Sequence, residues 1–371
     1  MAKLGEVATY INGYAFKPED WSDKGRPIIR IQNLTGSSDT INRYDGEIAS
    51  KYEINDGDVL ISWSASLGVY VWHGEQAVLN QHIFKVAFDK EDISKKFFVY
   101  QVESVLEKAA NEAHGATMKH LTKKVFDNLP FYLPSREEQE KIASKLEQVS
   151  KLIECRKLQL EKLDELVKSR FIEMFGGIND SSLYPYKTVK ELTNVISGGT
   201  PSRNNTEYWN EGSIPWVKTT ELQNNIITEV DEYITELGLE NSSAKIVPEG
   251  TILIAMYGQG KTRGMTGYLG VEACTNQACA CILPSDSISQ KFLWQYFILS
   301  YENLRNLAKG GNQPNLNGNL IKNYPVLYPP LDLQNQFADF VAQVDKSKLA
   351  VQKSLEQLEI LKKALMQEYF G

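Results

Sequence analysis

The stretch 135-SREEQEKIASKLEQVSKLIECRKLQLEKLDELVKSRFIEMFG-176 decides the fold of this chain. It predicts one helix of about 40 residues, roughly 60 Å long at 1.5 Å per residue. Ser135 followed by Glu138 predicts a capped start, and Gly176-Gly177 predicts a stop. Apolar residues recur at spacings of four and three, which is a coiled-coil seam: Ile142, Leu146, Val149, Ile153, Leu160, Leu163, Val167 and Met174. A seam this long needs a partner helix, because it would otherwise expose its apolar side chains to water.

The last segment of the chain, 331–371, supplies the partner. Aligned by the separation of Asn128 and Asn323, 195 positions, it repeats the seam: Phe337, Val341, Val344, Val351, Leu355, Leu358, Leu365 and Tyr369. Each seam is basic where the other is aliphatic: Arg156 and Arg170 align with Val351 and Leu365, and Lys348 and Lys362 align with Ile153 and Val167. Polar seam residues lower stability but fix partner and register. Two unrelated amphipathic helices on separate cores are the alternative, and the length of the shared periodicity favours pairing.

The repeat extends through the rest of the chain. The matching segments are Leu4–Val7 with Val189–Leu192, 27–30 with 215–218, 57–62 with 250–255, 80–81 with 276–277, and 115–121 with 310–316. The offset drifts from 185 to 196 along these pairs, so the loops differ in length while the framework holds. We expect an α+β chain in which two α/β domains, 1–134 and 188–330, are separated by two long antiparallel coiled-coil helices, 135–176 and 331–371. Residues 177–187 form the linker, and the halves are related by an internal pseudo-two-fold repeat.

Length and composition limit the number of domains, the class of protein and its location. The 371 residues allow two or three domains, and 42% hydrophobic with 23% charged residues is typical of soluble globular protein. The sequence has neither an apolar run of membrane-spanning length nor a signal peptide at Met1, so we expect a cytoplasmic protein without a membrane partner. Taken alone, the net charge of −7 argues against a nucleic-acid-binding protein with a basic surface. Cys274, Cys279 and Cys281 lack zinc-ribbon spacing and lie in an apolar run, which predicts buried strand thiols.

Two segments resemble enzyme motifs. Ala255–Thr262 resembles a phosphate-binding loop, but that mechanism needs a helix directly after Lys261-Thr262, and the glycines of Arg263–Gly267 disfavour one. Tyr328-Pro329-Pro330-Leu331 resembles the loop of adenine methyltransferases but lacks the leading Asn or Asp, so a proline-rich helix start is the better interpretation. The four histidines show no pattern for metal or nucleophilic chemistry. We therefore expect no catalytic site, no metal and no bound cofactor.

Polar loops at matching places of the two copies are the candidate binding residues. Their side chains suit base-edge and phosphate contacts, because Arg and Lys bind guanine or phosphate and Asn and Gln bind adenine. The first copy offers Lys17, Ser62, Trp63, Ser64, Lys119 and His120. The second offers Thr200, Ser202, Arg203, Asn204, Tyr257, Gln259, Lys261, Arg263, Asn312, Gln313 and Asn315. Surface loops are polar in any protein, so the repeated placement carries more weight than any single residue.

Over its whole length the chain resembles the DNA-specificity subunit of type I restriction–modification systems. The resemblance rests on an ordered set that occurs twice: Gly57–Ser62, Asn80-Gln81 with Asn276-Gln277, Gly198–Ser202, Asn312–Leu316, and a proline before each long helix. The first copy departs from it at Asn12–Phe16, which stands where the second has Gly-Gly-Thr-Pro-Ser, and at Thr117–His120. The two copies should therefore read different sequences.

The resemblance implies a non-catalytic subunit that recognises a two-part site on double-stranded DNA, with one target-recognition domain for each half-site. It implies that two methylation subunits and further restriction subunits join this chain, and that the methyl donor and ATP bind to those partners. The long helices would then separate the half-sites. A protein-interaction scaffold without a DNA role is the alternative, and the acidic charge favours it.

Overall fold

The computed structural model describes residues 1–64, 66–112, 122–178, 183–258, 260–308 and 315–371. Its contacts divide the chain into two compact units. The first unit comprises 1–158 and 352–371, and the second comprises 159–351. Each unit therefore contains one set of sheets and a part of both long helices. In the described residues, no helix combines the length and the apolar character needed to cross a membrane.

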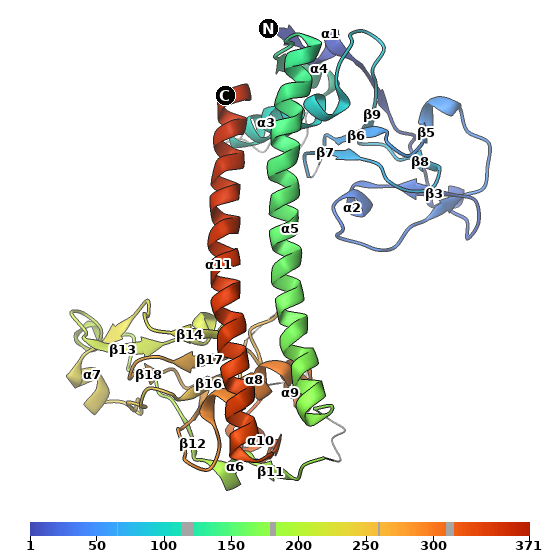
Figure 1. Cartoon of the computed structure of the whole chain (residues 1–371). Helices are drawn as coiled ribbons and strands as arrows, with labels where there is room; N and C mark the ends of the chain where they lie inside the picture. The colour runs from blue at the N-terminus through green and yellow to red at the C-terminus, as the bar shows by residue number, and fades with distance from the viewer. Residues whose placement is uncertain (65, 113–121, 179–182, 259, 309–314) are drawn as a thin grey trace. The chain divides into compact units, whose positions relative to one another are not determined.

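The first unit is built on two four-stranded sheets. The larger has the order β2 (Thr9–Asn12), β9 (Ile83–Ala87), β6 (Val59–Ser62) and β7 (Gly68–Val71). The smaller has the order β4 (Arg43–Tyr44), β3 (Arg26–Ile29), β8 (Ala77–Leu79) and β5 (Glu53–Ile54). A third pair joins β1 (Ala2–Lys3) to β10 (Pro130–Phe131). The helices are α1 (Leu4–Val7), α2 (Ile31–Leu34), α3 (Lys95–Glu112) and α4 (Lys123–Asp127), with short 3-10 turns at Pro18–Asp20 and Ser50–Tyr52 (Figure 1).

The second unit repeats this plan. Its larger sheet has the order β12 (Val195–Ser197), β19 (Cys279–Ile282), β16 (Ile252–Ala255), β17 (Thr266–Leu269) and β14 (Asn225–Ile227). Its smaller sheet has the order β15 (Tyr233–Ile234), β13 (Ile214–Val217) and β18 (Cys274–Thr275). The pair β11 (Tyr186–Thr188) and β20 (Pro325–Leu327) matches β1 and β10. The helices are α6 (Val189–Leu192), α7 (Glu236–Glu240), α8 (Gln290–Leu299), α9 (Tyr301–Leu307) and α10 (Gly318–Lys322), with 3-10 turns at Thr206–Tyr208 and Thr219–Glu221.

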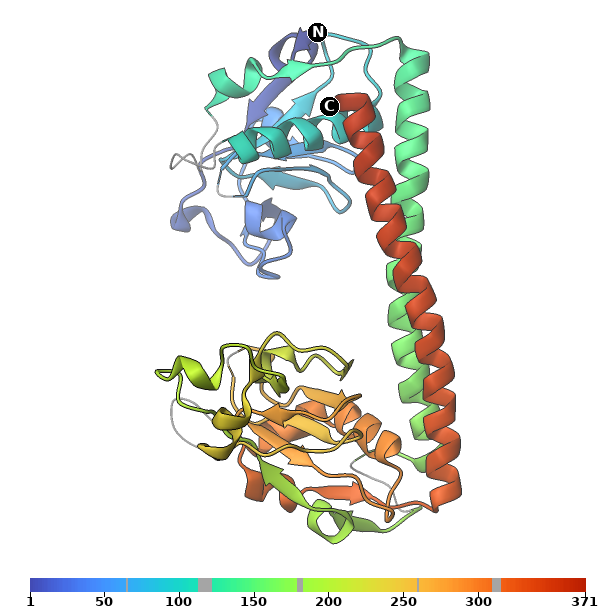
Figure 2. The same cartoon turned by 90° about the vertical axis from the view of Figure 1, so that its left-hand side faces the viewer.

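The two long helices are α5 (Arg136–Phe175) and α11 (Leu331–Phe370). In the first unit the amino-terminal part of α5 and the carboxyl-terminal part of α11 share one core, in which Leu146 and Phe370 are buried (Figure 2). In the second unit the opposite parts pair, with Phe171 and Phe337 both fully buried. The helices are therefore antiparallel, and every predicted seam position is buried or half-buried. This confirms the predicted fold class.

The basic seam residues have partners within their own unit. Three of them reach the opposite helix: the Arg156 guanidinium donates to Ser354 Oγ at 3.2 Å, the Arg170 guanidinium lies 5.8 Å from the Phe340 ring centre, and Lys348 Nζ lies 2.6 Å from Asp164 Oδ1. Lys362 instead approaches α3, with its Nζ 3.8 Å from Glu103 Oε2. These contacts depend on the register of the two helices, as expected for polar residues in a coiled-coil seam.

A glutamine near the start of each long helix ties it to its globular core. Gln139 accepts a hydrogen bond from the main-chain N–H of Ser94 at 2.9 Å and donates to the Pro134 carbonyl at 3.0 Å. Gln334 does the same with Ser289, at 2.8 Å, and Pro329, at 2.7 Å. Both glutamines are nearly fully buried, so both amides exchange water for main-chain partners. The internal repeat therefore extends to individual hydrogen bonds.

The cysteines lie where the sequence predicts them. Cys274, Cys279 and Cys281 are buried in β18 and β19, and Cys155 is exposed on α5. Burial raises the pKa of Cys274 and of Cys281 to about 11, so these thiols stay protonated at neutral pH. Among the described residues, no group of His, Cys, Asp and Glu could hold a metal ion.

Candidate nucleic-acid interface

Strand direction gathers two predicted loops of the first unit and the repeat anchor at 80–81 at one place. In the larger sheet β2 and β6 end where the antiparallel β9 begins. Residues 13–17, 62–64 and 80–82 therefore lie together, and we call them the first loop edge. The main-chain N–H of Trp63 donates to the His82 carbonyl at 3.2 Å, and Trp63 Nε1 donates to Asn12 Oδ1 at 3.2 Å. Trp63 thus connects the 62–64 segment to His82 and to the last residue of β2.

The second unit forms the matching arrangement, because β12 and β16 end where β19 begins. The second loop edge comprises residues 198–204, 256–258, 276–278 and 315–316. The main-chain N–H of Met256 donates to the Ala278 carbonyl at 2.8 Å, and that of Leu316 donates to the Met256 carbonyl at 3.0 Å. The Thr200 hydroxyl donates to Gln277 Oε1 across this edge.

Main-chain hydrogen bonds correct the alignment of the two loop edges. Gly13 donates to Ile83 as Gly198 donates to Cys279, and Tyr14 donates to Leu79 as Gly199 donates to Thr275. Gly13 is therefore the counterpart of Gly198, one position away from the pairing expected between Asn12–Phe16 and Gly198–Ser202. The expected alignment was based on residue types. The structure instead aligns strand β2 with strand β12, so that Tyr10 corresponds to Val195.

The candidate residues differ in accessibility. Lys17, Ser202 and Asn204 are exposed, and so is Tyr257, at 41%. Trp63 and Thr200 are half-buried. Ser62 and Ser64 are buried, and the Ser62 hydroxyl donates inward to the Ser66 carbonyl, so their side chains do not form the surface. Asn315 is exposed, whereas Lys119, His120, Gln259, Asn312 and Gln313 lie outside the described residues.

Arg203 is held by two rings and a carboxylate. Its guanidinium lies 3.6 Å from the Trp209 ring centre and 4.9 Å from that of Trp216, and it donates to Glu232. Burial opposes ionisation of Glu232, but hydrogen bonds from Arg203 and Lys218 hold its pKa below its ordinary value. Part of the positive charge of Arg203 is therefore neutralised by the protein itself.

Helix α9 fixes the loop that carries Lys261 and Arg263. The Tyr301 hydroxyl donates to the Lys261 carbonyl at 2.7 Å, and the Arg305 guanidinium donates to the Arg263 carbonyl at 2.9 Å. Residues 260–265 form turns, and the strand β17 follows at Thr266. This part of the chain therefore lacks the helix that a phosphate-binding loop requires.

Sequence reasoning missed three residues of the loop edges. Gln81 and Gln277 were recognised only as repeat anchors, although the repeated Asn-Gln pair was a signal for them. Tyr14 is exposed at 41%, two residues after the end of β2. Its segment was identified as a departure between the two copies, but Tyr14 itself was not proposed as a binding residue.

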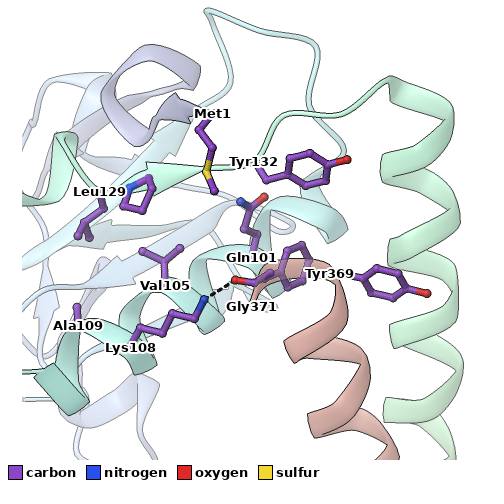
Figure 3. A pocket seen from close by; sticks show the side chains of 11 residues that line it. Met1, Gln101, Val105, Lys108, Ala109, Leu129, Tyr132, Tyr369 and Gly371 are labelled. Atoms are coloured by element: carbon purple, nitrogen blue, oxygen red, sulfur yellow. Dashed lines mark hydrogen bonds between the residues drawn. The ribbon is translucent and has the colours of Figure 1, made fainter.

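A hollow of about 330 Å³ opens elsewhere in the first unit, where α3, β10 and the last turn of α11 meet (Figure 3). Gln101, Val105 and Tyr132 line it, and the Lys108 ammonium donates to the Phe370 carbonyl at its rim. The described residues of its wall are mainly apolar and include no group of acids, bases and nucleophiles suited to catalysis.

Comparison with known proteins identifies one family that matches the chain twice, once for each copy of the repeat. The family described as "Type I restriction modification DNA specificity domain" matches residues 1–165 and 183–360. The chain is similar to the EcoBI specificity subunit of Escherichia coli, with 28% identity over 168 residues, 44% of this chain and 35% of that protein. It is also similar to the MjaVIII specificity subunit of Methanocaldococcus jannaschii, with 23% identity over 337 residues, 84% of this chain and 78% of that protein.

Among solved structures, the chain resembles the type I restriction–modification S subunit of M. genitalium. The TM-score is 0.59 at 16% identity, and the alignment covers 100% of this chain and 95% of that one. This likeness concerns the fold. The matched segments span 35% and 41% of the EcoBI and MjaIX specificity subunits. Because the family matches both copies of the repeat and more than half of the sequence, this chain belongs to the type I restriction–modification DNA-specificity family.

Proposed function

We propose that this chain is the sequence-specific DNA-recognition subunit of a type I restriction–modification complex. Each unit reads one half of a two-part site on double-stranded DNA through its loop edge. One observation carries this proposal: the same main-chain hydrogen bonds build both loop edges, while the side chains displayed on them differ. A shared framework with unlike side chains is what two readers of different half-sites require.

The chain itself performs no chemistry in this proposal. Methylation and cleavage belong to two methylation subunits and to restriction subunits, which bring the methyl donor and ATP. The acidic net charge of −7 fits this division, because methylation subunits that contact the phosphates would supply the salt-dependent affinity. The complex would act in the cytoplasm, where the DNA is.

The long helices separate the half-sites in this proposal. Recognition modules that follow one face of the duplex read sites about 10 base pairs apart, one helical turn. The seam of α5 and α11 repeats every seven residues. Removing seven residues from each helix therefore shortens the pair but leaves the same apolar residues facing each other. The two half-sites should then stay the same and the gap between them should shrink.

The test is to replace residues 1–134 with the matching segment of another specificity subunit, in cells that carry the methylation partners, and to map the methylated adenines. One half-site should change and the other should persist. If both half-sites persist, the first unit does not read DNA. A protein scaffold without a DNA role, which the acidic charge favours, would leave the methylome unchanged even when the whole chain is deleted.

A further inference from the structure

One main-chain position is the same in the two loop edges, but it carries a different residue in each. The main-chain N–H of Tyr14 donates to Leu79 at 2.8 Å, and that of Gly199 donates to Thr275 at 2.8 Å. Tyr14 is therefore the structural counterpart of Gly199. The Tyr14 carbonyl also accepts a hydrogen bond from the N–H of Gln81 at 2.8 Å, which fixes the tyrosine against the Asn-Gln segment present in both units.

The second unit has no room for a side chain at this position. A Cβ atom on Gly199 would lie 2.3 Å from the main-chain nitrogen of Ala244, closer than non-bonded atoms approach. In the first unit the residue at this position carries a ring, which packs 5.5 Å from the ring of Tyr52, centre to centre. The difference between the units is therefore set by the backbone that covers the position as well as by the residue itself.

Tyr14 belongs to an aromatic group that faces solvent on the loop edge. Its ring centre lies 4.9 Å from that of Phe16, and it is 41% exposed although its neighbours are partly buried. Basic residues flank the group: Lys17 is exposed, and Lys51 Nζ lies 4.8 Å from the Tyr52 ring centre. An exposed apolar face with lysines nearby suits contact with a base edge and its neighbouring phosphates.

We propose that Tyr14 determines part of the specificity of the first unit by apolar contact with the C5-methyl group of a thymine in the major groove. This inference rests on the proposed function. The methyl group is the apolar feature that distinguishes a base pair containing thymine in that groove, and side chains with apolar surface recognise it. Lys17 and Lys51 contact the neighbouring phosphates. The second unit reads its half-site without this contact, because Gly199 presents no side chain.

The experiment measures affinity of the complete complex with its methylation subunits for duplexes that carry its own site. Each thymine of the first half-site is replaced in turn by deoxyuracil, which removes only the methyl group. The complex is prepared with the native chain, with Tyr14→Ala and with Tyr14→Phe. Trp21→Ala is the matched control, because Trp21 is an exposed aromatic residue, at 42%, that stacks on Arg30 rather than on the rings around Tyr14.

At least one replacement should weaken binding of the native complex about fourfold, the loss expected for one buried methyl group. The same replacement should leave the Tyr14→Ala complex unaffected, while Tyr14→Phe and Trp21→Ala keep the native response. Replacements in the other half-site should show no dependence on Tyr14. Equal losses in native and Tyr14→Ala complexes, or no thymine whose methyl matters, would overturn the inference and leave two-part recognition intact. Failure of the native complex to prefer its site would instead remove the proposed function.

Discussion

Lys348 Nζ of α11 lies 2.6 Å from Asp164 Oδ1 of α5, in the part of the seam that belongs to the second unit. Lys348 occupies a seam position and is 28% exposed, whereas Asp164 lies at the rim and is 70% exposed. A third charge, Asp345, approaches the same ammonium at 3.7 Å. The pair of helices is therefore joined here by one cation between two carboxylates.

The two carboxylates should respond oppositely to neutralisation. Partial burial raises the pKa of Asp345, whose side chain is still 47% exposed, against the lowering effect of Lys348. Its small contribution to stability is therefore present below the ordinary carboxyl pKa and is lost as pH rises through its folded value. We expect Asp345→Asn to raise the midpoint of urea unfolding at neutral pH. The variant should also lose less stability than the native chain as pH rises above the ordinary carboxyl pKa. Asp164→Asn should lower stability by less than about 1 kcal/mol, because its ion pair is exposed. A loss with Asp345→Asn would contradict the assignment.

Phe171 should be among the most costly residues to truncate in the second unit. Its fully buried ring lies 5.1 Å from the Phe175 ring and 5.5 Å from that of Phe337, centre to centre, so it joins α5 to α11. Phe171→Ala should lower the free energy of unfolding by about 3–5 kcal/mol through lost burial and a cavity. Ile172→Ala, at a neighbouring position that is 50% exposed, should change it by less than about 0.5 kcal/mol. Similar losses at both sites would mean that the seam faces elsewhere.

The helix pair could be predicted because its evidence is local. Seam residues recur every three or four positions, so Leu146 and Val341 can be placed in the core without any knowledge of their neighbours. The strands Val59–Ser62 and Ile252–Ala255 were predictable for the same reason, as short apolar runs bounded by turns. In each case the pattern of apolar residues shows directly which side chains are buried.

The chemistry of the loop edges could not be predicted to the same extent. Arg203 owes its setting to Trp209, Trp216 and Glu232, which lie up to 29 positions away in sequence. The surface role of Tyr14 depends on which main-chain groups it bonds, and residue types do not reveal the register of a strand. The DNA contacts assigned to the individual loop residues therefore stay predictions.

Only Cys155 should react quickly with a thiol reagent in the folded protein. The other thiols are buried, and burial raises the pKa of Cys274 and Cys281, which keeps them in the unreactive protonated form. Labelling with a chromogenic disulfide at pH 8 should release one equivalent quickly, and all four should react after unfolding in urea. Cys155→Ser should abolish the fast phase. A fast phase that persists in this variant would show that β18 or β19 opens readily.

The hydrogen bond from Tyr301 to the Lys261 carbonyl should affect DNA affinity more than global stability. Tyr301→Phe removes the hydroxyl, which also accepts a hydrogen bond from Arg305 at 3.1 Å, and the net value of each such bond is about 0.5–1.5 kcal/mol. We expect up to about a tenfold loss of affinity for the native site, measured by anisotropy with the methylation partners present. Tyr233→Phe is the control, because Tyr233 is an exposed tyrosine of the same unit. A large fall in the unfolding midpoint would show that the bond supports the fold rather than the loop.

Releasing Arg203 from Glu232 should strengthen DNA binding and make it more sensitive to salt. Glu232→Gln removes the carboxylate that neutralises the guanidinium but leaves the rings of Trp209 and Trp216, so the cation stays in place with its charge uncompensated. If Arg203 contacts a phosphate, the slope of log affinity against log salt should steepen by up to about 0.9.

The matched control for this charge change is Glu207→Gln, because Glu207 is an exposed acid of the same unit, whereas the carboxylate paired with Arg203 belongs to Glu232. Both variants change the net charge equally, so a general electrostatic effect would appear in both. A steeper slope confined to Glu232→Gln, and lost again in the double variant Arg203→Gln/Glu232→Gln, would place the phosphate contact at Arg203. Equal slopes in the two single variants would assign the effect to net charge alone, and Arg203 would then serve only to hold Trp209 against Trp216.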